Sequence, residues 1–123
     1  MNELELSMLS SNSTIFQRLS KAVSVAVLAS INNKLMLVGG EFEPSARGHA
    51  GAGNFSDQAT MINVGQGRVN IEKSVKGPVA RGWSSGDVWK PKEGENMIVV
   101  VGGLCGDDTA PVRLMDVWKG KME

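Results

Sequence analysis

Leu35-Met-Leu-Val-Gly-Gly40 and Met97-Ile-Val-Val-Val-Gly-Gly103 are two nearly identical segments, each an apolar run that stops on a pair of glycines. Such a short aliphatic run cannot make a helix of ordinary length and predicts a buried β-strand. The glycines permit a turn with positive φ, or the close approach of another part of the chain. We therefore expect both segments to be core strands of an all-β protein.

The surroundings of the two segments also match, which indicates an internal repeat. A polar turn sequence precedes each copy, at residues 30–34 and 91–96. A Gly-rich polar loop containing a proline follows each copy and leads to an aspartate and a further apolar run, at residues 57–64 and 115–118. Polar turns between short apolar runs are typical of antiparallel hairpins, so the chain is predicted to be a repeat of antiparallel strands.

The remaining strands follow from the same pattern. Residues 22–30 are predicted to pair with the first aliphatic run, and residues 57–64 and 68–74 to form the outer two strands, joined at Gly65-Gln-Gly67. Residues 84–90 are predicted to open the second unit. Trp83 and Trp89 are six positions apart and would share one strand face if no bulge intervenes. They would then pack against a neighbouring sheet or form an aromatic platform for a ligand.

Over residues 21–119 the sequence resembles the kelch repeat of β-propellers, in the group similar to the galactose oxidase central domain. The second unit carries the resemblance best, with Pro78-x-x-Arg81 at its start, the Gly-Gly pair, and Asp116 and Trp118 in its last strand. The first unit departs from the pattern, because it lacks the opening Arg-x-x-His and a closing tryptophan. The glycine pairs are 63 positions apart (40 to 103), whereas the kelch period is roughly 50.

The resemblance implies antiparallel four-stranded blades of a kelch-type propeller, present as an incomplete set of about one and three-quarter blades. Residues 1–20 are expected to be a flexible lead-in, residues 21–76 the first blade and residues 77–123 the incomplete second blade. A closed propeller needs roughly four to eight blades. The chain is therefore expected to be a fragment of a longer propeller, or to cover its open blade edges by self-association. A compact domain with another closure is the remaining alternative.

Composition excludes several function classes. Thirteen basic and thirteen acidic residues cancel, so nothing indicates binding to nucleic acid or to an anionic membrane. Residues 22–30, the most apolar stretch, are too few to span a bilayer. Cys105 is the only cysteine, which excludes an internal disulfide and indicates a reducing compartment such as the cytoplasm.

We expect a non-catalytic scaffold that binds a protein partner through the loops after each Gly-Gly pair, residues 41–56 and 104–113. The candidate contacts are Arg47, Arg81 and Arg113, because exposed arginines are enriched at protein interfaces. No catalytic residue and no cofactor is predicted, since no nucleophile–base set, zinc spacing or phosphate loop can be assembled.

Glu41 and His49 are the candidates for a metal site. Plant specifier proteins, a kelch branch, hold iron with a Glu-x-x-x-Asp-x-x-x-His motif, and Glu41, Ser45 and His49 have that spacing. Serine replaces the central carboxylate, and two ligands are fewer than such a site requires, so no metal is predicted. The alternatives are a fragment of a specifier-like iron enzyme, or a truncated remnant without function, which would aggregate.

Overall fold

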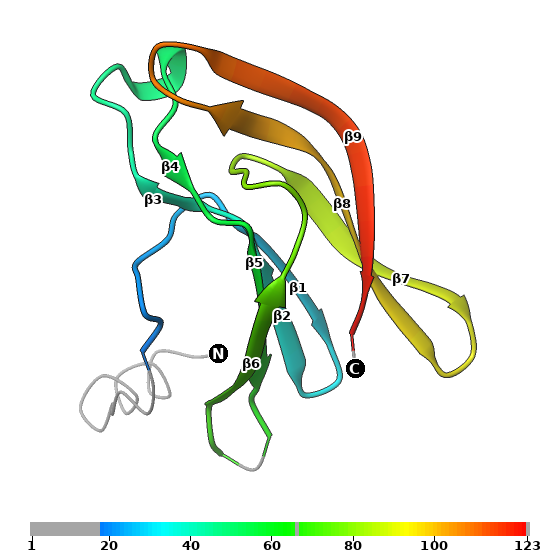
Figure 1. Cartoon of the computed structure of the whole chain (residues 1–123). Coiled ribbons are helices and arrows are strands. Elements are labelled where there is room, and N and C mark those ends of the chain that lie inside the picture. The colour runs from blue at the N-terminus through cyan, green and yellow to red at the C-terminus, as the bar shows by residue number, and fades with distance from the viewer. Residues whose placement is uncertain (1–17, 66, 123) are drawn as a thin grey trace, which may run out of the picture.

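The computed structural model describes residues 18–65 and 67–122, except the side chain of His49. Within them the chain forms antiparallel β-sheets and one short 3-10 helix, with no α-helix (Figure 1). The all-β prediction is confirmed at this level. Most of the predicted lead-in, residues 1–20, lies outside the described residues.

The first sheet has four strands in the order β1-β2-β5-β6. They are β1 (Val27–Ile31), β2 (Lys34–Val38), β5 (Gln58–Asn63) and β6 (Asn70–Lys76). Between β2 and β5 the chain makes an excursion that contains β3 (Glu41–Glu43), the 3-10 helix η1 (Gly48–Ala50) and β4 (Asn54–Phe55). β3 and β4 pair with each other as a separate ribbon, so this predicted loop is partly ordered as a small hairpin.

The second sheet has three strands in the order β7-β8-β9. They are β7 (Ser85–Lys92), β8 (Glu95–Gly106) and β9 (Pro111–Lys121). Tight turns join β1 to β2 and β7 to β8, and both turns contain a residue with positive φ, Asn32 at 51° and Gly94 at 79°. Asparagine and glycine tolerate this conformation best, which explains why the polar turn sequences close these hairpins as predicted.

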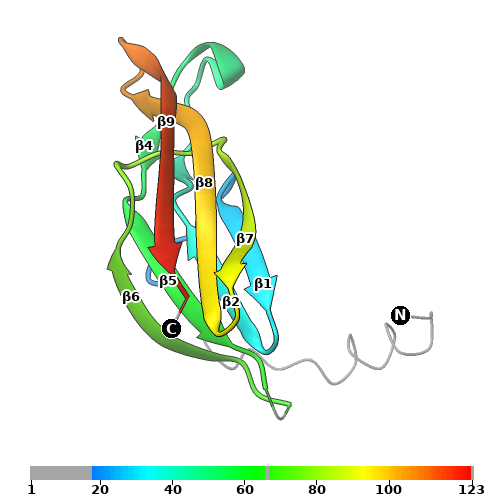
Figure 2. The ribbon, with the colours of Figure 1, turned by 90° about the vertical axis from the view of Figure 1, so that its right-hand side faces the viewer.

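The two sheets pack face to face, and the hydrophobic core lies between them (Figure 2). Alternation along β1 decides which side chains face the core: Val27 and Ala29 are buried, whereas Leu28 and Ser30 are exposed. Gly86 lets β7 approach β1, because a Cβ there would lie 2.7 Å from Val27 Cγ1. The buried core residues are Val27, Ala29, Met36, Val38, Ala59 and Met61 of the first sheet with Ile98, Val100 and Met122 of the second part of the chain.

Three predictions about strand ends are wrong. The first strand begins at Val27 and not near residue 22, because Val25 has φ 49° and Ser24 forms an isolated bridge with Glu41. β8 continues past its glycines to Gly106, because a register shift between Val101 and Gly103 absorbs the irregularity and pairing with β9 resumes. The loop predicted at residues 104–113 is therefore reduced to residues 107–110.

Trp83 and Trp89 do not share a strand face. Trp83 precedes β7 and has φ 60°, so the alternation of the strand does not extend back to it. The two side chains are 48% and 46% exposed, and Lys119 Nζ lies 5.8 Å from the centroid of the Trp89 ring. Trp118 instead packs against the core.

None of the helices in the described part of the chain is long and apolar enough to cross a membrane.

Candidate binding surface

The two Gly-Gly pairs have closely similar φ angles. The φ angles are 69° and 107° for Gly39 and Gly40, and 62° and 112° for Gly102 and Gly103. Side-chain-bearing residues rarely adopt such angles, which explains the glycine pair in each copy. The residue after each pair then forms an isolated bridge, Glu41 with Ser24 and Leu104 with Gly82. The repeat seen in the sequence is thus a repeat of geometry.

The chain beyond each glycine pair reaches the same end of the molecule. The β3–η1–β4 excursion and the β8–β9 hairpin lie side by side there (Figure 1). Ser45 Oγ donates a hydrogen bond to Asp108 Oδ1, and the Arg47 guanidinium donates to the backbone carbonyl of Asp108. Arg47 Nε also lies 3.5 Å from Asp108 Oδ1. These contacts join two loops that are about 60 residues apart in sequence. We call the surface that the β3–η1–β4 excursion and the β8–β9 hairpin form at this end the loop surface.

The Asp108 carboxylate is held ionised in this arrangement. The Ser45 hydroxyl, with a smaller contribution from the charge of Arg47, lowers the pKa of Asp108 below its ordinary value. Its neighbour Asp107 shapes the hairpin tip: the Thr109 hydroxyl and the backbone N–H groups of Thr109 and Ala110 donate to Asp107 Oδ1. The same donors, the Thr109 hydroxyl first, lower the pKa of Asp107. No motif in the sequence indicates that Asp108 and Ser45 meet.

Arg81 is not an exposed contact, so this premise of the sequence prediction is wrong. Its side chain is 1% exposed and forms a bidentate ion pair with Asp116, with Nη1–Oδ1 and Nη2–Oδ2 distances of 2.5 and 2.7 Å. Nη1 also donates to the Gly102 carbonyl and Nε to the Val79 carbonyl, each at 3.0 Å. All the nitrogens of the guanidinium are engaged inside the protein, so we assign Arg81 a structural role.

The backbone of Arg81 connects the two sheets. Its carbonyl accepts a hydrogen bond of 2.7 Å from the Gly40 N–H, and its N–H donates to the Ser56 carbonyl at 3.2 Å. Its side chain binds Gly102 and Asp116 of the second sheet. One residue thereby fixes the glycine pair of the first unit to that of the second.

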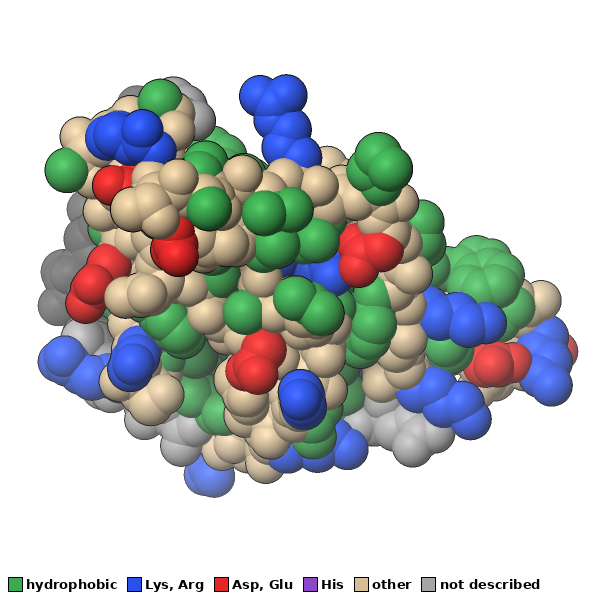
Figure 3. Space-filling view, turned by 45° about the horizontal axis from the view of Figure 1, so that its top comes forward, with side chains coloured by type: hydrophobic (Ala, Val, Ile, Leu, Met, Phe, Trp, Pro, Cys, Tyr) green, Lys and Arg blue, Asp and Glu red, His purple; other side chains and the backbone are tan. Residues whose placement is uncertain are grey.

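Arg47 and Arg113 are exposed, as the sequence prediction required. Arg47 belongs to the loop surface through its contacts with Asp108. Arg113 lies on β9 opposite Leu104 and lines a hollow of about 360 Å³ together with Trp83, Gly103, Leu104 and Leu114. Figure 3 looks onto the loop end and shows hydrophobic side chains at the surface among charged ones. Whether these arginines bind a partner stays a prediction.

Glu41, the first metal candidate, is buried at 6% exposure, and its Oε2 accepts a hydrogen bond of 3.2 Å from the Gly53 N–H. Position 53 requires glycine for a separate reason, because a Cβ there would lie 1.6 Å from the Glu43 carbonyl oxygen. His49 lies in η1, and its side chain is outside the described part. Among described side chains, no group of three or more His, Cys, Asp or Glu is placed to hold a metal ion.

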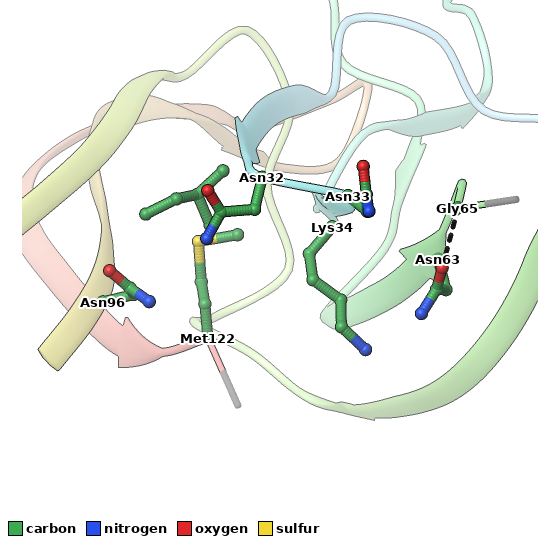
Figure 4. Close-up of a pocket in the computed structure, with 8 residues that line it drawn as sticks. Asn32, Asn33, Lys34, Asn63, Gly65, Asn96 and Met122 are labelled. Carbon is green, nitrogen blue, oxygen red and sulfur yellow. Dashed lines mark hydrogen bonds between the residues drawn. The ribbon is translucent and has the colours of Figure 1, made fainter. Parts of the chain in front are cut away.

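Another hollow lies at the opposite end of the molecule, beside the β1–β2 turn, and has a volume of about 580 Å³ (Figure 4). Its walls are rich in amides: Asn32, Asn33, Asn63 and Asn96, with Lys34 and Met122. Two of these side chains, Lys34 and Asn63, already form hydrogen bonds within the protein. Asn63 Oδ1 accepts from the Gly65 N–H at 2.9 Å, and Lys34 and Asn63 both bind Glu72.

No protein-family model matches this sequence, and a search of curated proteins finds no match.

Proposed function

We propose that this protein is a kelch-type binding scaffold that contacts a protein partner through the loop surface, without catalysing a reaction. The observation that carries the proposal is the joining of both post-glycine loops at Asp108. Two rigid sheets supply the framework, and the loops at one end present variable side chains, which is how β-sheet scaffolds bind partners.

The kelch assignment is supported by the two packed antiparallel sheets and by the matching φ angles of the glycine pairs. In this proposal the four-stranded sheet is one blade and the three-stranded sheet an incomplete one. The single free thiol of Cys105 supports placing the protein in a reducing compartment, and we propose the cytoplasm. An iron site through Glu41 is not proposed, because its carboxylate is committed to Gly53.

Arg113 and Arg47 are the contacts we propose for the partner. A planar guanidinium binds carboxylates and backbone carbonyls in pairs, so a partner segment with acidic or carbonyl groups suits them. Arg113→Ala should weaken binding about tenfold to a hundredfold, in the range of an interface hot spot. Arg47→Ala should weaken binding and also loosen the contact with Asp108.

The test uses the immobilised full chain to retain proteins from a lysate of the source cells, followed by titration of the purified candidate. Lys92→Ala is the matched control, because Lys92 is exposed at the β7–β8 turn, away from the loop surface. Loss of affinity in Arg113→Ala with no change in Lys92→Ala supports the proposal. Equal binding by all variants, each with unchanged circular dichroism, contradicts it.

A further inference from the structure

The two sheets are related position by position, which allows their surfaces to be compared directly. The row Val27–Val38–Ala59 across β1, β2 and β5 matches the row Ser85–Val101–Val117 across β7, β8 and β9. Gly40 then matches Gly103, and Val25 matches Trp83, and both members of the second pair have positive φ. These correspondences follow from strand register once the two glycine pairs are aligned, and they do not depend on the kelch assignment.

Matching faces of the two sheets differ in burial: one is covered and the other is exposed to solvent. The face of the first sheet with Val27, Val38 and Ala59 is buried against the second sheet. The matching face of the second sheet, which we call the head face, is exposed: Val101 at 49% and Val117 at 67%. The surface of the second sheet that covers the first includes Gly86, Val100 and Trp118, and it matches the outer side of the first sheet, which we call the tail face. On the tail face Leu28 is exposed, whereas Leu35, Leu37 and Ile62 are half-buried.

The described sheets therefore contain one completed head-to-tail junction and, on their two outer faces, the two halves of another. We propose that the head face of one copy binds the tail face of a second copy of this chain, repeating the packing of the second sheet on the first. Such a contact joins different surfaces, so it is heterologous and builds rings or filaments.

The hollow at Gly103 fits this occupant. In the completed junction, backbone groups of Val25, Gly40 and Ser56 hold the segment that opens the second sheet: the Trp83 N–H donates to the Val25 carbonyl, and Arg81 exchanges hydrogen bonds with Gly40 and Ser56. The matching positions in the second unit, Trp83, Gly103 and Leu114, line the hollow of about 360 Å³. The segment that would enter it from a second copy is residues 23–25.

Side-chain volumes are complementary in the proposed junction. In the completed junction the Val27 side chain packs against Gly86, which has no side chain. The matching pair in the proposed junction is Ser85 with Leu28, so here too a small residue lies opposite a larger one. Asp87 and Lys119 occupy the positions of Ala29 and Met61. Because Ala29 and Met61 are buried in the completed junction, the proposed junction places two charged groups inside the contact, and we expect it to dissociate on dilution.

The experiment measures the mass of the purified full chain by size-exclusion chromatography with light scattering over a wide range of concentrations. The wild-type chain should form species larger than a monomer, whose mass rises with concentration. Val117→Lys removes the head face and Leu28→Lys removes the tail face, and each variant alone should be monomeric. Both side chains are exposed, so circular dichroism and the melting temperature should stay close to wild type.

Mixing the two variants gives the decisive readout. The intact tail of Val117→Lys and the intact head of Leu28→Lys can form one junction, so the mixture should give a one-to-one dimer and no larger species. A symmetric interface would not produce this pattern. Val79→Lys is the matched control, because Val79 is exposed at 63% in the link between the sheets and belongs to neither face; it should associate like wild type.

A wild-type chain that stays monomeric at every concentration overturns the proposal. It is also overturned if Val79→Lys abolishes association, which would indicate unspecific apolar contact, or if the mixed variants remain monomers. None of these variants changes Arg47 or Arg113, and no foreign partner is present, so failure here leaves the proposed binding function standing, and the reverse also holds.

Discussion

Arg81 places a positive charge inside the protein, where its backbone also joins the two sheets. In the structure the guanidinium is 1% exposed and is bound by Asp116 and by two backbone carbonyls. A buried charge persists only when it is paired and hydrogen-bonded, and Asp116, 35 positions away, supplies the pair.

The ion pair of Arg81 and Asp116 should make stability depend on pH. The hydrogen bond from Arg81, followed by its charge, lowers the pKa of Asp116 below the ordinary 3.8. A carboxyl group whose pKa is lower in the folded state stabilises the fold above its unfolded pKa, and this contribution is lost as pH falls through the folded pKa. Thermal melts between neutral pH and acid should therefore show a falling melting temperature below about pH 4.

Asp116→Asn isolates this contribution, because Asp107, Asp108 and Glu72 also have lowered pKa values. The variant should be less stable than wild type at neutral pH, since the buried Arg81 charge loses its partner. The difference between the two melting temperatures should shrink as pH falls. A difference that stays constant from neutral pH to acid would contradict the assigned role of the ion pair.

The Gly-Gly elements combine two demands on the backbone, positive φ and close approach. Gly39 has φ 69°, and a Cβ there would lie 2.6 Å from the Arg81 carbonyl oxygen. Gly94 in the β7–β8 turn has a similar φ of 79° but open space around it. Comparing alanine substitutions at the two positions separates two contributions to the loss of unfolding free energy. A substitution at Gly94 introduces only an unfavourable φ, whereas a substitution at Gly39 also introduces a steric clash.

Gly39→Ala should therefore destabilise the protein more than Gly94→Ala. Positive φ alone costs about 1–2 kcal/mol for alanine, and this is the loss in unfolding free energy expected for Gly94→Ala. The clash at Gly39 should add about 1–3 kcal/mol by displacing the chain at Arg81. Chemical denaturation of both variants measures the two losses, and equal losses would show that the packing at Gly39 is loose.

The whole molecule is held together by a core to which both sheets contribute. Ile98 and Val100 are fully buried against residues of the first sheet, and Arg81 and Gly40 tie the sheets at the loop end. Neither sheet can bury its inner face alone, so the sheets should unfold in one cooperative step.

The positions of the tryptophans allow this to be tested. Trp83, Trp89 and Trp118 are the only tryptophans and all belong to the second unit, so fluorescence reports that unit while far-ultraviolet circular dichroism reports both sheets. Ile98→Ala should lower the unfolding free energy by about 2–5 kcal/mol and shift both signals to the same new midpoint. A circular dichroism transition that stays at the wild-type midpoint would show that the sheets unfold separately.

The sequence alone determined the local elements of this protein. Short aliphatic runs, polar turns at residues 32–33 and 93–94, and glycine pairs predict strands and hairpins because strand alternation and positive φ are properties of the few residues involved. The repeat was visible for the same reason.

Only the tertiary structure decided which elements contact one another and which side chains those contacts bury. The burial of Arg81, the meeting of Ser45 with Asp108, the extension of β8 past its glycines and the exposure of the head face all depend on residues tens of positions apart. Such contacts are set by how the two sheets pack and by which polar groups can be paired between them. Local sequence patterns do not indicate which distant residues will meet, because only the packing of the folded chain brings those side chains together.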